Sequence, residues 1–169
     1  EISNAPLLLE FARKKKQLIL STGMSYMSEI EKALGVIAFG LLGKKMPSKK
    51  GFSKAYKSNN GKKLLKKYVT LLHCTSAYPT ETKEINLNCI NSLKKKFQLR
   101  TGFSDHSSGI MASIIAVSMG ATLIEKHITL DKNLPGPDHL ASLDPIEFKQ
   151  MISEIRNIKI MMGSSKKIP

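Results

Sequence analysis

The sequence predicts a parallel α/β fold of about four strand–helix units, corresponding to the C-terminal half of a (β/α)8 barrel. Short apolar runs, of the kind buried on both faces of a parallel sheet, alternate with stretches of helical periodicity. Polar residues follow each apolar run, as they do at the carboxyl edge of such sheets. Four units are half of a barrel, and 169 residues fall short of the about 250 that a complete barrel takes.

Four runs rich in Val, Ile and Leu are the expected strands. They are short and do not alternate between apolar and polar residues, which favours strands covered on both sides. A doubly wound sheet fits the same alternation, but no GxGxxG pattern follows any run, so a dinucleotide site has no support. The expected strands span residues 17–21, 68–74, 99–104 and 121–127.

Five segments between and around these runs have helical spacing of apolar residues. In the second, Ser28 is the expected N-cap, with Glu29 in the first turn where a carboxylate suits the helix dipole. In the last, Pro145 occupies the first helical position and Gly163 lies just past the end. The expected helices span residues 5–16, 28–37, 84–97, 108–119 and 144–162.

The net charge of +14 is concentrated in one segment. Ten lysines and no acidic residue lie between Lys44 and Lys67, so the remaining residues carry a net charge of only +4 (14 − 10). We interpret residues 39–67 as a lysine-rich insertion that stays solvated on the surface. Contact with RNA or DNA through this segment is the alternative, and we expect no nucleic-acid partner for the domain as a whole.

Several protein classes are disfavoured by composition. No apolar run approaches the about 20 residues that span a bilayer, and we expect no membrane partner. Cys74 and Cys89 form no disulfide pattern, which favours the cytoplasm and buried structural thiols rather than a nucleophile. The chain begins at Glu1 rather than Met, which fits a piece of a larger protein.

Two histidines stand at matched positions after the third and fourth expected strands. Neighbouring parallel strands lie about 4.8 Å apart, so His106 and His127 could share one ion. Two imidazoles suit a borderline divalent cation such as Mn²⁺, Fe²⁺ or Zn²⁺, with open positions for substrate and water. Two unrelated surface histidines remain the alternative. The loop KNLPGPDH, residues 132–139, is expected to be rigid, with Asp138 and His139 placed to hold a hydroxyl-rich ligand or simply to cap the strand.

Five motifs together resemble the sialic acid (N-acetylneuraminate) synthase family, which includes the legionaminic and pseudaminic acid synthases. The resemblance covers nearly the whole chain outside the 39–67 segment. The motifs are LILSTGM (18–24), TLLHCTSAYP (70–79), GFSDHSSGI (102–110), GATLIEKHITLDKNLPGPDHLASLDP (120–145) and IRNI (155–158).

This resemblance implies a transferase that condenses phosphoenolpyruvate with an N-acylated hexose such as N-acetylmannosamine and releases phosphate. It implies that His106 and His127 bind the divalent metal, Mn²⁺ first, with Mg²⁺ or Co²⁺ possible. The metal would polarise the sugar aldehyde. Glu1 would carry a proton near that aldehyde. The implied substrate-binding residues are Ser21 and Ser104 for phosphoenolpyruvate, Tyr78 and Asp138 for the sugar, and Ser76, whose role stays open.

The family's fold is a (β/α)8 barrel followed by an antifreeze-like domain, and its members are homodimers in which that domain reaches across to the partner. The N-terminal half barrel and the antifreeze-like domain are absent from these 169 residues, so we expect the chain alone to be inactive. A lysine-rich RNA-binding module and a catalytically dead half barrel that associates with a partner are the competing interpretations.

Overall fold

A computed structural model describes residues 1–166, and its centre is one sheet of four parallel strands. The strands follow one another in sequence order, β1-β2-β3-β4, so each pairs with the next along the chain. All four expected strands are confirmed, each within a few residues of the predicted bounds. They are β1 (Leu18–Ser21), β2 (Val69–Cys74), β3 (Arg100–Asp105) and β4 (Ile124–Lys126).

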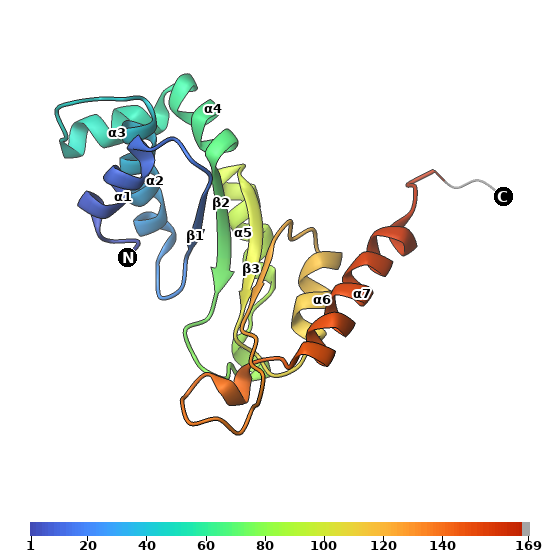
Figure 1. Cartoon of the computed structure of the whole chain (residues 1–169). Coiled ribbons are helices and arrows are strands. Elements are labelled where there is room, and N and C mark those ends of the chain that lie inside the picture. Colours follow the sequence, from blue (N-terminus) through green and yellow to red (C-terminus); the bar gives the residue numbers. More distant parts are fainter. Residues whose placement is uncertain (167–169) are drawn as a thin grey trace.

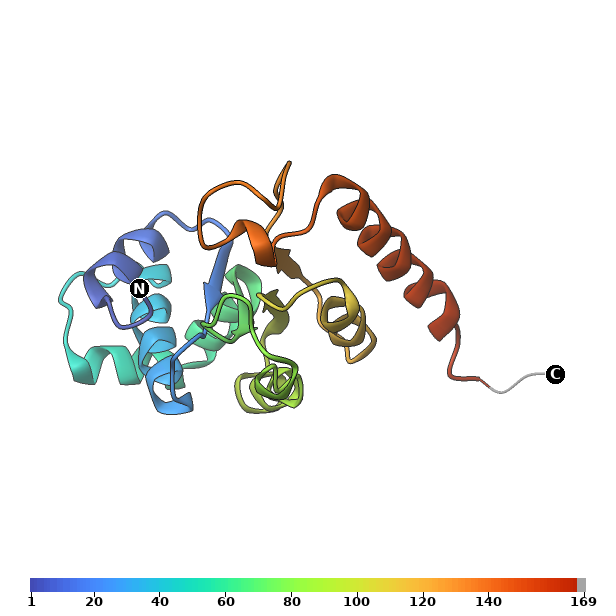
Figure 2. The same cartoon turned by 90° about the horizontal axis from the view of Figure 1, so that it is seen from below.

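Helices cover one side of this sheet. Viewed from below, the strands lie inside an arc of helices, and the arc is open on the opposite side (Figure 2). This is the layout of half a (β/α)8 barrel, as predicted. The α-helices are α1 (Ala5–Arg13), α2 (Met27–Leu41), α3 (Lys49–Lys57), α4 (Asn59–Tyr68), α5 (Asn88–Phe97), α6 (Met111–Ser118) and α7 (Pro145–Met162), with 3-10 turns η1 (Thr82–Glu84) and η2 (His139–Ala141).

The predicted ends of the helices are confirmed for α7 but not for α2 or α5. Asp144 caps α7 through the backbone N–H of Glu147, and Pro145 and Gly163 stand where expected. Ser28 is not the N-cap of α2. The helix begins at Met27, and its N-cap is Tyr26, whose backbone N–H donates to the Glu29 carboxylate at 2.7 Å. The segment expected as one helix over 84–97 instead forms η1, a break, and then α5.

The main core lies between α1, α2 and the first two strands. Leu34 and Ile37 of α2 and Val69 and Leu71 of β2 have no solvent exposure. On the open face of the sheet the situation is different, since Ile19 of β1 is 55% exposed. An apolar strand residue facing solvent is what half of a barrel presents where the other half would pack.

The lysine-rich segment keeps its ten lysines exposed, but it is folded into two helices that the sequence analysis did not predict. It forms α3 and α4, and both helices pack an apolar side on α2. Phe52 meets Phe39 edge to face with ring centroids 5.1 Å apart. The apolar side was not predicted, because lysines dominate the sequence of this segment. It comprises Phe52, Ala55, Tyr56, Leu64, Leu65 and Tyr68.

No helix within residues 1–166 combines the length and apolar character that a bilayer crossing needs.

Candidate active site

Three aromatic rings meet at the carboxyl edge of the sheet. The rings of His106 and His127 have centroids 5.4 Å apart and are steeply inclined to one another. The ring of Tyr78 stacks on His106 at 4.1 Å and meets the edge of His127 at 5.6 Å. The predicted proximity of the two histidines is therefore confirmed, and the loop after β2 places Tyr78 against both rings.

His106 is held in one orientation by the backbone. Its Nδ1 lies 2.8 Å from the carbonyl oxygen of Thr75, so Nδ1 carries the proton and donates it there. Its Nε2 lies 3.4 Å from the Ser104 hydroxyl, but that hydroxyl donates to Glu125 Oε1 at 2.7 Å. The lone pair of Nε2 is thus left available, which is the arrangement that a metal-binding histidine needs.

A row of three polar side chains crosses the sheet beside the histidines. The strand register pairs Cys74 with Ser104 and Ser104 with Glu125. Residues paired across neighbouring parallel strands point to the same face. The row therefore lines the same open face as His106 and His127, which lie two residues beyond Ser104 and Glu125.

A buried ion pair fixes the two strand ends from the opposite face. Asp105 precedes His106 and Lys126 precedes His127; their side chains have no solvent exposure and lie 3.3 Å apart. The Asp105 carboxylate also accepts from the backbone N–H and hydroxyl of Ser107 and from the hydroxyl of Ser113 on α6. Lys126 donates to the Ser107 carbonyl. Because each partner is adjacent to a histidine, the pair sets the spacing of β3 and β4 where the histidines emerge.

The contact between Cys74 and His106 shifts the pKa of both side chains. Burial raises the pKa of the Cys74 thiol, but hydrogen bonds with His106, Ser21 and Ser104 outweigh it, and the net pKa is lowered. Burial opposes protonation of His106, yet Cys74, the Thr75 carbonyl and Asp105 together raise its pKa. A cation at His106 Nε2 would compete with that proton, so metal binding would weaken as pH falls.

Two contacts anchor the loop over residues 132–139. The Lys132 ammonium pairs with Glu147 of α7 at 2.5 Å. His139 Nδ1 lies 2.7 Å from the Thr129 hydroxyl. The exposed Asp138 contributes, after burial and Cys74, to raising the pKa of Tyr78. The loop thus holds His139 against Thr129.

The remaining predicted residues are placed less centrally. Ser21 ends β1 and interacts with the Cys74 thiol. Ser76 lies in the exposed loop after β2, with its hydroxyl only 2.6 Å from where a side chain on Gly23 would begin. Glu1 is exposed at the N-terminus; its carbonyl accepts from Asn4, and its carboxylate forms no hydrogen bond with another predicted site residue within residues 1–166.

Two site residues were missed in the sequence. Glu125 was overlooked, although it lies two residues before His127 and therefore shares its face. Cys74 was assigned to the core, but it is half-buried and its Sγ lies 3.8 Å from His106 Nδ1. Alternation along β4 could have indicated Glu125, whereas its pairing with Ser104 required the register of β3 on β4.

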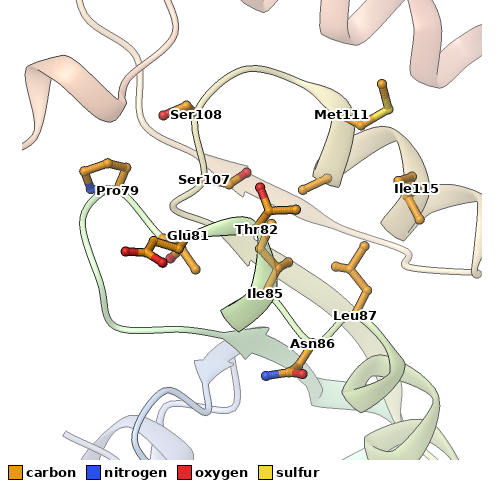
Figure 3. Close-up of a pocket in the computed structure, with 12 residues that line it drawn as sticks. Pro79, Glu81, Thr82, Ile85, Asn86, Leu87, Ser107, Ser108, Met111 and Ile115 are labelled. Atoms are coloured by element: carbon orange, nitrogen blue, oxygen red, sulfur yellow. The ribbon is translucent and has the colours of Figure 1, made fainter.

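A separate hollow of about 660 Å³ lies between η1, the segment after it and α6 (Figure 3). Apolar side chains of Ile85, Leu87, Met111 and Ile115 line it, with Glu81 and Ser108 at its rim. Neither His106 nor His127 lines this hollow. The chemistry-bearing residues therefore define the candidate site on the open face of the sheet, and the hollow is not part of it.

The histidine cluster fits a divalent cation held by few protein ligands. Within residues 1–166 there is no group of three or more His, Cys, Asp or Glu side chains arranged for a metal. Two imidazoles, one with its tautomer fixed by a backbone carbonyl, provide a partial ligand set. Such a set leaves coordination positions for water and substrate oxygens, as catalytic metal sites do.

Parallel strands in barrel order, with histidines, hydroxyls and a carboxylate gathered at their carboxyl edge, define a (β/α)-barrel enzyme site. The family model described as the NeuB family matches residues 1–167, and the chain belongs to this family.

Individual relatives agree with this assignment. The N,N'-diacetyllegionaminic acid synthases of Legionella pneumophila and Campylobacter jejuni are 43% and 44% identical over 169 and 167 residues, covering 100% and 99% of this chain. The crystal structure of N-acetylneuraminic acid synthetase from Leptospira borgpetersenii, in complex with citrate, superposes with a TM-score of 0.77 at 34% identity over 99% of this chain. The chain spans 42% and 43% of the two synthases and 50% of the crystallised chain.

Proposed function

We propose that the protein carrying this chain is a sialic acid synthase-type transferase. It would condense phosphoenolpyruvate with an N-acylated hexose such as N-acetylmannosamine, giving a nonulosonic acid and phosphate. The observation that carries this proposal is the pair His106 and His127, whose ring centroids lie 5.4 Å apart at the carboxyl edge of a NeuB-family half barrel. Since two similar relatives are named N,N'-diacetyllegionaminic acid synthases, a hexose with two acetamido groups is the second candidate sugar.

We assign the divalent cation, Mn²⁺ first and Mg²⁺ or Co²⁺ as alternatives, to His106 and His127. When bound, it would supply Lewis-acid polarisation of the sugar aldehyde. The Thr75 carbonyl fixes the His106 tautomer, and the Asp105–Lys126 pair fixes the separation of the two strand ends. Both contributions keep the ligand geometry preorganised before substrate arrives.

The hydroxyl and carboxylate groups around the histidines would bind the two substrates. Ser104 and Ser21 are assigned to phosphoenolpyruvate, where hydroxyl donors suit phosphate oxygens. Glu125 would hold the Ser104 hydroxyl in place through the 2.7 Å hydrogen bond. Tyr78 and Asp138 would contact the sugar. Tyr78 contacts both histidine rings, and the charge of Asp138 contributes to raising the pKa of Tyr78. By family resemblance, Glu1 remains assigned to proton transfer and Ser76 to substrate binding with its role open.

We further propose that the whole protein is cytoplasmic and homodimeric. Cys74 and Cys89 are both free thiols, as a reducing compartment favours. The homodimer follows from the family resemblance. Because these 169 residues are less than half of the similar synthases, activity belongs to the whole protein and is expected to be absent from the isolated chain.

Phosphate release tests the proposal. The whole protein is incubated with phosphoenolpyruvate, Mn²⁺ and a panel of N-acylated hexoses, and phosphate is measured against His106→Ala and His127→Ala. Release with one sugar, lost in both variants and after chelation, is expected and identifies the substrate. Release that persists without either histidine would contradict the metal assignment, and no release with any sugar would contradict the reaction.

A further inference from the structure

We propose that helices α3 and α4 form a docking surface for an anionic lipid bilayer. The surface, called here the lysine face, consists of exposed lysines on these two helices and on the loop before them. The inference is independent of the chemistry at the histidines. The lysine face comprises Lys44, Lys45, Lys49, Lys50, Lys54, Lys57, Lys62, Lys63, Lys66 and Lys67.

The charge of this face is not neutralised within the described chain. No aspartate or glutamate occurs between Lys32 and Thr80. None of the ten ammonium groups pairs with a carboxylate within residues 1–166, where the five ion pairs involve other residues. A cluster of this size therefore presents a concentrated positive potential to any polyanion.

The lysines project from a rigid scaffold rather than from a flexible tract. Leu65 is almost fully buried against the core, and Phe52 packs edge to face on Phe39. The backbone of Phe52 approaches so closely that a side chain at Gly35 would lie 3.1 Å from its carbonyl oxygen. Helix α4 runs directly into β2, which is central to the sheet. The helices that carry the lysines are thus folded before any partner binds, which lowers the entropic cost of binding.

Residue types on the face favour lipid over nucleic acid. Residues 39–67 contain no arginine, the residue best suited to bidentate phosphate and base contacts. The side chains of Phe52 and Tyr56 are partly buried against the core, which limits their availability for stacking on bases. Met46, in contrast, is 85% exposed in the loop between Lys45 and Lys49. An apolar side chain flanked by lysines, whose stems are themselves aliphatic, suits the boundary between headgroups and acyl chains.

The position of the face is compatible with catalysis at the other end of the sheet. Helices α3 and α4 lie at the end where the strands begin, and the loop over residues 131–138 lies at the end where they finish (Figure 1). A bilayer bound by the lysine face would leave the histidine cluster open to substrate. This departs from the sequence-based expectation of no membrane partner, which rested on the length of apolar runs and not on how the lysines are arranged.

The test is vesicle co-sedimentation of the whole protein at about 0.15 M ionic strength. Vesicles of phosphatidylcholine alone are compared with vesicles containing about 30% phosphatidylglycerol. The variant K50Q/K63Q is matched with K149Q/K159Q, which removes the same charge from exposed lysines of α7. Binding to the anionic vesicles only is expected. K50Q/K63Q should weaken it by about 25-fold, about fivefold per lysine, whereas K149Q/K159Q should leave it within about twofold. Circular dichroism checks that both variants fold.

Two further measurements separate lipid from nucleic acid. Met46→Gln is expected to weaken vesicle binding by about threefold, because it removes the inserted apolar group. A single-stranded RNA of mixed sequence, titrated at the same ionic strength, is expected to bind more weakly than the anionic vesicles. The proposal is overturned if anionic and neutral vesicles bind equally, if both lysine variants lose binding to the same extent, or if RNA binds more tightly and Met46→Gln changes nothing.

Discussion

Neutralising Asp105 should destabilise the protein far more than neutralising an exposed acid does. Asp105→Asn keeps the shape and the two Ser107 contacts of Asp105, but leaves the Lys126 ammonium without a counter-charge at a site with no solvent exposure. Removing one partner of a buried ion pair costs about 3–5 kcal/mol. Burial lowers the pKa of Lys126, and Asp105 opposes this shift. In Asp105→Asn the lysine can therefore lose its proton, which limits the loss of stability. The loss of stability should shrink as pH rises.

The assay is urea unfolding of the whole protein followed by circular dichroism, at pH 7 and at pH 9. The matched control is Glu81→Gln, whose carboxylate pairs with Lys83 at 2.7 Å while both side chains are largely exposed. Such a surface pair contributes about 0–1 kcal/mol. The double variant Asp105→Asn/Lys126→Met leaves no buried charge, so it should recover most of the stability lost in Asp105→Asn. The reasoning is refuted if Asp105→Asn costs no more than Glu81→Gln, or if the double variant is less stable than Asp105→Asn.

Three other predictions concern single residues. Burial lowers the pKa of His73 despite the contact of its ring with the Ile85 carbonyl, so folding disfavours protonation of this histidine. The contribution of neutral His73 to stability is complete above the unfolded-state pKa of about 6.5. That contribution is lost as pH falls toward the folded-state pKa. The free energy of unfolding of the wild type should therefore fall more steeply than that of His73→Gln below about pH 6.5, and parallel curves would disprove this. Gly102→Ala would place a Cβ 2.3 Å from the Leu123 carbonyl oxygen, so the urea midpoint should fall by the equivalent of at least about 1–3 kcal/mol; an unchanged midpoint would contradict the packing. Glu125→Gln should lower phosphate release about tenfold, because the hydrogen bond that the Ser104 hydroxyl donates to residue 125 loses its charge assistance. Thermal stability should be nearly unchanged, and full activity would exclude Glu125 from the site.

The strands and most helix positions could be predicted because their signals are local. β1 and β2 contain short apolar runs, and the start of α7 is marked by Asp144 as its N-cap and Pro145 in its first turn. The helices α3 and α4 were missed, although Phe52, Ala55 and Tyr56 have helical spacing. The many lysines favoured a solvated surface segment over helices. Burial of the apolar side against α2 depends on packing that the sequence does not show.

The candidate site, too, could be predicted only in part from the sequence. His106 and His127 could be predicted because each directly follows a strand of the same sheet. The contact between Ser104 and Glu125, the stacking of Tyr78 on His106 and the buried Asp105–Lys126 pair depend on strand register and on which face each residue takes. A shift of one residue would reverse the faces, so these contacts required the three-dimensional structure.

Direct binding of Mn²⁺ to the whole protein tests the central claim, that His106 and His127 form the metal site. Electron paramagnetic resonance of free Mn²⁺ gives the stoichiometry and affinity without any requirement for activity. One ion per chain is expected, with affinity reduced at least about 100-fold in His127→Gln and in His106→Gln, while Glu81→Gln binds like the wild type. Unchanged Mn²⁺ binding in both histidine variants would contradict the claim.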